Sequence, residues 1–192
     1  MNPAALIVAL SLGLLTLRAD AADPPKPPAP DKPADVSVGD TRVMTFPAAT
    51  FLHAPTRTTF ADMVGPIEKT LAAVEKGVND KQITPAGSAM FVYRGVQQVK
   101  GPNDPFDLEI GWIVADTQQP VGDLKVRKAD AFKCLAVVFQ GPVAGMGAAY
   151  GKVMSDLSAR KLEPTGEHRE IYLHWEGKDS PNNVVWLLIG IK

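Results

Sequence analysis

The sequence predicts an α+β domain in which a tandem strand–helix–strand–strand repeat forms one antiparallel sheet, with two helices on one face and a ligand cleft on the other. Three observations predict it: an internal repeat at an offset of 79 residues, helical periodicity at matching places in both halves, and strand-like runs around each helix. The chain has 192 residues, of which 45% are hydrophobic and 21% are charged. This balance excludes a disordered tail protein and a polytopic membrane protein.

The first 21 residues have the pattern of a signal peptide. The segment 4–17 is a continuous apolar run, shorter than the ~20 residues that cross a bilayer as a helix. Ala19 and Ala21 then supply the small residues of a cleavage site, although the start of the chain (Met1-Asn2-Pro3) carries no Lys or Arg. A buried N-terminal helix is the alternative. We expect cleavage after Ala21, a location in the periplasm or outside the cell, and no stable membrane insertion afterwards.

Residues 22–35 form a proline-rich linker. They hold six prolines and no large apolar side chain, so an extended, semi-rigid spacer is expected. A ligand for a polyproline-binding partner is the functional alternative, and docking of the domain on an envelope protein through this tether is another. The folded domain is expected over residues 36–192.

The internal repeat rests on two matching anchors. Pro85-Ala86-Gly87 is followed six residues later by Tyr93, and Pro164-Thr165-Gly166 is followed six residues later by Tyr172. The repeat halves span about 41–116 and 124–192. Neither unit can bury an apolar sheet face by itself, but two units placed side by side can. They are therefore expected to share one sheet with both helices on one face.

The elements of the two halves follow in the same order. Apolar residues at spacings of three and four predict helices over about 58–77, from Ile67, Leu71 and Val74, and over about 145–161, from Tyr150, Val153 and Leu157. Strand-like runs precede and follow each helix, at 42–52, 88–96, 106–114, 132–140, 169–175 and 184–191.

Three motifs resemble a known family, the GyrI-like small-molecule-binding domain, also called the AraC-type effector-binding domain. They are DLEIG (107–111), FQGP (139–142) and LEPTGEHREIY (162–172). The resemblance covers roughly residues 41–192. It implies a cleft between the repeats for amphipathic or cationic organic molecules, lined by an acidic strand residue and aromatics. Some stand-alone members are hydrolases, and many members carry a glutamate where this chain has Trp186.

Strand alternation divides the side chains between the two sheet faces. Leu108, Ile110 and Trp112 suit the helix side, as do the aliphatic residues that alternate with Trp186; in the tyrosine-bearing strands Met90, Val92 and Ile171 are assigned there too. The open face is then expected to present the ligand-binding residues Phe91, Tyr93, Glu109, Glu170, Tyr172 and Trp186. Carboxylates among aromatic faces suit a cation. Ordinary sheet packing for the aromatics and a solvated acid for Glu109 are the alternatives.

Other kinds of site find little support. With 20 Lys plus Arg against 21 Asp plus Glu and no basic stripe, no nucleic-acid partner is expected. His168 and His174 share a strand face with Glu170 but are about 20 Å apart along an extended strand, so no metal is expected. Cys134, the one cysteine, lies in a strand-like run and is expected in the core.

The expected function is binding of a small organic molecule, cationic or amphipathic, in the cleft between the repeats, as an exported binding or sensor module. The alternative is a small-molecule hydrolase in which Glu109 or Glu170 acts as general base and a tyrosine as proton donor. No catalytic residue is assigned, because no nucleophile paired with a base is recognisable. No cofactor is expected, and any protein partner stays open.

Overall fold

A computed structural model describes residues 36–192. The expected signal peptide and the proline-rich linker lie outside these residues. The helices and strands, in chain order, are β1 (Ser37–Val38), β2 (Arg42–Phe46), β3 (Ala49–Thr58), α1 (Val64–Asn79), β4 (Pro85–Arg94), β5 (Phe106–Val114), β6 (Lys125–Ala129), β7 (Phe132–Gln140), α2 (Met146–Ala159), β8 (Pro164–His174) and β9 (Val184–Ile191). In residues 36–192 no helix is both long and apolar enough to cross a membrane.

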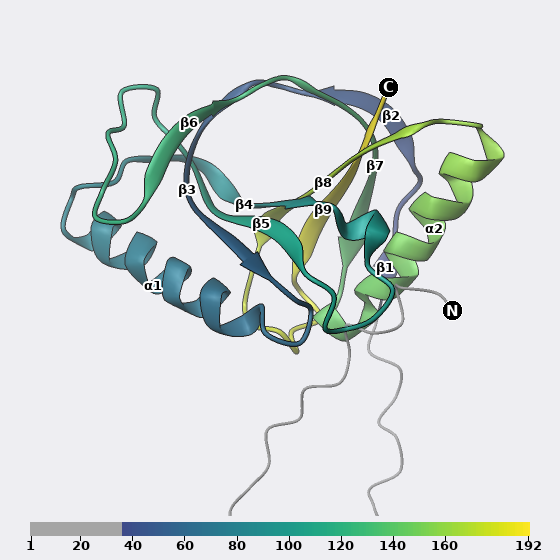
Figure 1. Ribbon diagram of the computed structural model, residues 1–192, viewed down its shortest axis with the longest axis horizontal. Coiled ribbons are helices and arrows are strands. Elements are labelled where there is room, and N and C mark those ends of the chain that lie inside the picture. Colours follow the sequence, from purple (N-terminus) through teal and green to yellow (C-terminus); the bar gives the residue numbers. More distant parts are fainter. Residues whose placement is uncertain (1–35) are drawn as a thin grey trace, which may run out of the picture.

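The strands form one antiparallel sheet in the order β1-β7-β9-β8-β4-β5-β3-β6, and β2 also pairs with β7 (Figure 1). This order is symmetric about the β4–β8 pair, with β5 and β3 on one side and β9 and β7 on the other. The units β3-α1-β4-β5 and β7-α2-β8-β9 therefore occupy equivalent places. The predicted α+β fold class and its tandem repeat are confirmed.

The pairing of β4 with β8 brings equivalent positions of the two repeat halves opposite each other at the centre of the sheet. Phe91 of β4 lies opposite Glu170 of β8, and the two positions are 79 residues apart. Val92 pairs with Glu109 in the first half, and its equivalent Ile171 pairs with Trp186 in the second. Glu109 and Trp186 are therefore repeat-equivalent, as predicted.

The strand expected over 42–52 is divided in two. The β2–β7 pairing ends at Phe46↔Phe132, and the β3–β6 pairing begins at Ala49↔Ala129 in the same register. The interruption falls at Pro47, whose nitrogen has no hydrogen to donate to a sheet. The two long arms, β2–β3 and β6–β7, run alongside each other and arch over one side of the sheet (Figure 1). Strand β6, which is mostly charged, was not predicted.

Both helices pack on the opposite side of the sheet from the one that the arms cover, and α2 contacts β7 as well as β9 on that side. We call this side the helix face, and the side beneath the arms the arm face. On the helix face, α1 packs against Leu108 and Ile110, and α2 packs against Leu187 and Ile189. The arm face holds a second buried cluster that includes Met90, Val92, Phe132, Cys134, Ile171 and Leu188. Burial raises the pKa of the Cys134 thiol to about 11, which agrees with a core residue and not with a nucleophile.

The first helix begins later than predicted, at Val64 instead of about residue 58. Strand β3 continues to Thr58, and a turn precedes the helix, in which the Asp62 backbone amide donates to the Thr59 hydroxyl. The second helix lies within the predicted range. Local periodicity thus located both helices, while pairing of β3 with β5 determined where the first begins.

Candidate functional site

A cavity of about 1370 Å³ opens on the helix face, lined by both helices and by β4 and β8. The sequence predicted the cleft on the opposite face, and the structure corrects this placement. From the helices come Ile67 and Leu71 of α1 and Met146, Tyr150 and Met154 of α2. The sheet floor contributes Phe91, Tyr93, His168, Glu170 and Tyr172. Large apolar walls with a few polar groups are typical of small-molecule sites.

Glu170 is the central polar group of this cavity. Its side chain is buried, and its carboxylate accepts hydrogen bonds from three tyrosine hydroxyls. Tyr150 donates to Oε1 at 2.5 Å, while Tyr93 and Tyr172 each donate to Oε2 at 2.8 Å. One donor comes from α2, one from β4 and one from β8 itself, so the arrangement exists only when both repeat halves are in place.

The charge of Glu170 is not neutralised by a basic group. Within the described part of the chain no Arg, Lys or His forms an ion pair with it, and its polar neighbours are the three tyrosines. Burial raises the pKa of Glu170, and the three hydrogen bonds oppose this only in part. Burial also lowers the pKa of the nearby His168 to about 4, so this imidazole is neutral at pH 7.

Aromatic rings extend from this carboxylate to the rim of the cavity. The ring of Tyr172 lies 4.8 Å from that of Phe91 and 5.5 Å from that of Trp175, measured between centroids. Trp175 is 46% exposed and marks the rim. The charged lining residues comprise the four acids Glu68, Glu75, Glu170 and Asp179 and the single base Lys178. An aromatic wall with an acidic excess favours a flat or lipophilic cation.

Four of the six sequence-predicted residues line this cavity, namely Phe91, Tyr93, Glu170 and Tyr172. Their predicted face was wrong: they lie beneath the helices, and Met90, Val92 and Ile171, which were assigned there, lie on the arm face. The reason is that both faces are buried, so both rows of each strand are apolar. The register of the β4–β5 pair shows which row faces the helices: Phe91 lies directly opposite Ile110, a helix-face residue.

Glu109 and Trp186 lie on the arm face, as strand alternation predicted, and therefore outside the cavity. The Glu109 carboxylate accepts from Arg127 Nη2 at 2.5 Å and from Arg94 Nη1 at 3.1 Å. Partial burial raises the pKa of Glu109, but these two guanidinium groups lower it by more, so the net shift is downward. Trp186 packs edge-on against Phe46. Both residues thus stabilise the layer between sheet and arms.

Replacing Glu109 by Gln is expected to destabilise the fold by about 1–3 kcal/mol, because two guanidinium groups lose a charged acceptor in a half-buried place. A carboxyl pKa lowered by folding contributes stability above its unfolded value of 4.5 and loses it as the pH falls through the lowered pKa. Urea unfolding near pH 7 should therefore show the loss, which should shrink on acidification. Asp107→Asn, in an exposed pair with Arg57, is the matched control and should change little. Equal stability of Glu109→Gln and the parent at neutral pH would contradict this assignment.

Among the residues that donate to Glu170, Tyr150 is the one that the sequence analysis did not identify as a site residue. It was assigned to the apolar stripe of the second helix, where its ring does pack against the core. The residue type could have indicated its role, because the hydroxyl of a tyrosine in this apolar stripe requires a hydrogen-bond partner when it is buried. Only the approach of α2 to β8 shows that the partner is Glu170.

No group of three or more His, Cys, Asp or Glu side chains within residues 36–192 is arranged to hold a metal ion. His168, Glu170 and His174 all line this cavity, but His174 lies at the end of β8 and contacts Glu176, with 3.0 Å between Nε2 and Oε1. The polar groups around Glu170 are tyrosine hydroxyls that donate to its carboxylate, and such donors do not supply the ligand set of a metal ion.

No protein-family model and no curated protein matches this sequence. Among solved structures, the EcmrR C-terminal domain matches 80% of this chain and 97% of its own, with 17% identity and a TM-score of 0.62. SAV2435 bound to tetraphenylphosphonium matches 80% of this chain and 94% of its own, with 10% identity and a TM-score of 0.58. A hydrolase from Listeria innocua matches 79% and 91%, with 12% identity and a TM-score of 0.55. The resemblance seen in the sequence motifs is thereby confirmed for the architecture, and the chain has a GyrI-like fold.

Proposed function

We propose that this domain binds a small lipophilic cation in the helix-face cavity, as a binding or sensor module. The observation that carries the proposal is the buried Glu170 carboxylate, which has three tyrosine donors and no basic partner in the described chain. A buried carboxylate without a counter-ion is costly, and a bound cation would offset that cost. The aromatic wall adds cation–π attraction and a large apolar contact area.

The solved structure of SAV2435 with tetraphenylphosphonium supports the choice of probe. Isothermal titration calorimetry should show binding of tetraphenylphosphonium and much weaker binding of tetraphenylborate. The two ions share their shape and four phenyl groups but carry opposite charges, so size and hydrophobicity are matched. Equal affinity for both would show that the cavity selects by shape alone, and preference for the borate would overturn the proposal.

Cation affinity is expected to depend on pH through Glu170. Because burial raises the pKa of this carboxyl above 4.5, lowering the pH protonates it sooner than an exposed glutamate. Affinity for tetraphenylphosphonium should therefore fall on acidification, beginning at a higher pH than an exposed glutamate would give, while tetraphenylborate affinity should hold or rise. His168 stays neutral until the pH approaches its own pKa of about 4. Calorimetry across the series measures both curves, and a flat curve for the cation would argue against an ionised Glu170 in the complex.

Hydrolysis is a second candidate, favoured by the raised pKa of Glu170. Burial raises the pKa of Glu170, which makes the carboxylate a stronger base than an exposed glutamate, and a neighbouring tyrosine is a proton donor. Both Glu170 oxygens, however, already accept hydrogen bonds from tyrosines, so they are less available to take a proton from an attacking water. The binding function is therefore better supported. Turnover of an activated ester in the cavity, abolished in Glu170→Gln while binding persists, would establish the enzyme.

We propose further that the domain acts outside the cytoplasm. The support is the apolar run 4–17 followed by Ala19-Asp20-Ala21, in residues that lie outside the described part of the chain. Amino-terminal sequencing of the mature protein should give Ala22 as the first residue. A retained Met1 would overturn this location without affecting the cavity.

A further inference from the structure

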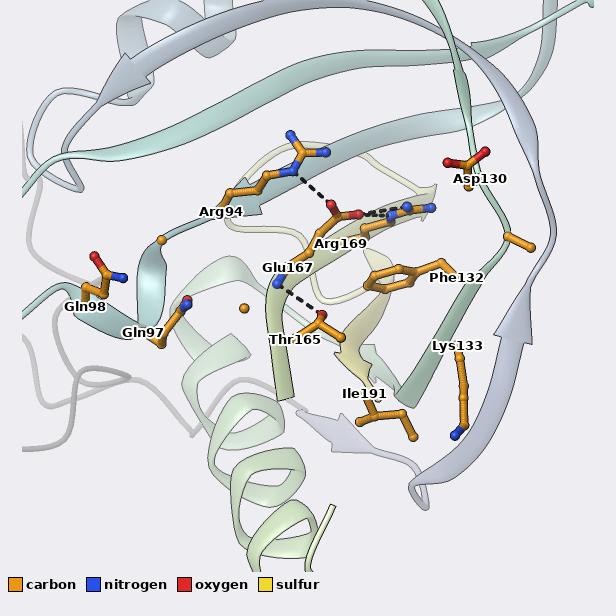
Figure 2. A pocket seen from close by; sticks show the side chains of 13 residues that line it. Arg94, Gln97, Gln98, Asp130, Phe132, Lys133, Thr165, Glu167, Arg169 and Ile191 are labelled. Atoms are coloured by element: carbon orange, nitrogen blue, oxygen red, sulfur yellow. Dashed lines mark hydrogen bonds and ion pairs between the residues drawn. The ribbon is translucent and has the colours of Figure 1, made fainter. Parts of the chain in front are cut away.

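A second pocket lies at one end of the arm face, and its lining is mainly charged and polar, unlike that of the aromatic cavity. It has a volume of about 610 Å³ and is lined by the end of β4, the β6–β7 connection, the start of β8 and the end of β9. Figure 2 shows Arg94, Glu167 and Arg169 grouped above Phe132, with Asp130 at the side. The lining of the two pockets has only Gln97 and Gly166 in common. None of the residues assigned to cation binding belongs to this second pocket.

The pocket is one end of a chain of alternating charges. Arg127 and Arg94 both donate to Glu109, Arg94 also donates to Glu167 through Nε at 2.9 Å, and Arg169 donates to Glu167 through Nε at 2.8 Å. Three arginines and two glutamates leave a net charge of 3 − 2 = +1. The neighbouring His53 adds no charge at pH 7, because its burial and surroundings lower its pKa. The network is therefore one negative charge short.

The uncompensated charge resides at Arg169. Its side chain is only 5% exposed, and its Nη2 lies 2.7 Å from Glu167 Oε1, so Nε and Nη2 both serve the same carboxylate oxygen. Nη1 is buried and has no hydrogen-bond partner among residues 36–192. In Figure 2 one end of the guanidinium meets Glu167, and the other extends away from it toward the side where Asp130 is drawn. A buried guanidinium N–H without an acceptor costs free energy that an anion would recover.

The walls beside Arg169 define the size and character of such an anion. The Arg169 guanidinium lies over the Phe132 ring, 4.0 Å from its centroid, and Ile191 and Ala131 add further apolar surface. Lys133 lines the pocket with an amine, and Asp130 with an exposed carboxylate. A single missing charge calls for a monoanion, and a planar carboxylate matches the N–H geometry of a guanidinium.

We infer that this pocket binds a small monocarboxylate, whose oxygen accepts from Arg169 Nη1 and whose short apolar part lies against Phe132 and Ile191. This is a second site, independent of the cation proposed for the helix face. The bound carboxylate supplies the missing negative charge of the ion-pair network that connects β4 and β8 on the arm face. Asp130 repels the ligand weakly from the rim, since its own carboxylate has the same sign.

The experiment follows backbone amide signals of the folded domain by NMR during titration with sodium acetate, and separately with inorganic phosphate, at constant ionic strength. Saturable shifts at residues 130–133 and 165–169 are expected with acetate and weaker ones with phosphate. Arg169→Gln should weaken acetate binding at least tenfold, whereas Arg57→Gln, in an exposed pair on β3, should leave it unchanged. Tetraphenylphosphonium binding should survive Arg169→Gln, which keeps the two sites distinguishable.

Asp130→Asn provides a test that leaves the buried network intact. Removal of this rim charge should tighten acetate binding several-fold without loss of thermal stability. If Asp130 instead turns inward and serves as the counter-ion of Arg169, Asp130→Asn will lower the melting temperature and will not tighten binding. That result, or the absence of saturable shifts with either anion, overturns the proposal.

Discussion

Glu170→Gln should weaken tetraphenylphosphonium binding by about 2 kcal/mol or more, a loss of about thirtyfold, while leaving the domain folded. The substitution removes the one buried charge of the cavity and keeps the size of the side chain and an oxygen that accepts from the tyrosines. The stability of the free protein should hold or rise slightly, because folding raises the pKa of this carboxyl and so opposes its ionised form. Calorimetry gives the affinity, and a thermal melt gives the stability.

The matched control for Glu170→Gln is Glu68→Gln, which removes a carboxylate of the same cavity on the exposed surface of α1. Solvent screens this charge, so its loss should change cation affinity only a few-fold. Tetraphenylborate should bind Glu170→Gln at least as well as the parent. Similar losses in the two variants, or a loss for the borate as well, would mean that Glu170 organises the tyrosines and does not attract the charge.

Gly111→Ala should destabilise the fold by more than about 3 kcal/mol, one of the largest effects available from adding a single methyl group. A Cβ at Gly111 would lie 1.9 Å from the Leu52 carbonyl oxygen and 2.7 Å from the His53 Cα, so it meets the backbone of β3. Backbone cannot rotate out of the way as a side chain does, and β3 would have to separate from β5. Urea unfolding followed by circular dichroism should show a much lower midpoint.

Gly151→Ala is the matched control for this substitution and should have the opposite sign. Gly151 lies inside α2, and no atom lies within 4 Å of the added Cβ. Alanine is favoured over glycine within a helix by about 0.5–1 kcal/mol, so the variant should be stabilised. Equal midpoints for Gly111→Ala and the parent would show that β3 and β5 accommodate the methyl group.

The order of the elements and the repeat were determined by the sequence alone. Apolar spacing located both helices, and the anchors at Gly87 and Gly166 aligned the halves at the register observed across β4 and β8. These features are local or depend on comparing one half with the other, so they need no knowledge of packing. The fold class followed because two strand–helix–strand–strand units have few ways to share a sheet.

Which face of the sheet holds the site was decided only by tertiary structure. Strand alternation separates two rows of side chains but does not say which row a helix covers, and here the arms bury the second face as thoroughly as the helices bury the first. Glu109 and Glu170 are both strand carboxylates among apolar neighbours, and no local pattern distinguishes them. Their partners do: arginines from β4 and β6 neutralise Glu109, whereas Glu170 meets the hydroxyl of Tyr150, carried on a helix that docks from the opposite side. Charge compensation is a property of contacts between distant segments, and for that reason the uncompensated acid could be recognised only once those segments were brought together.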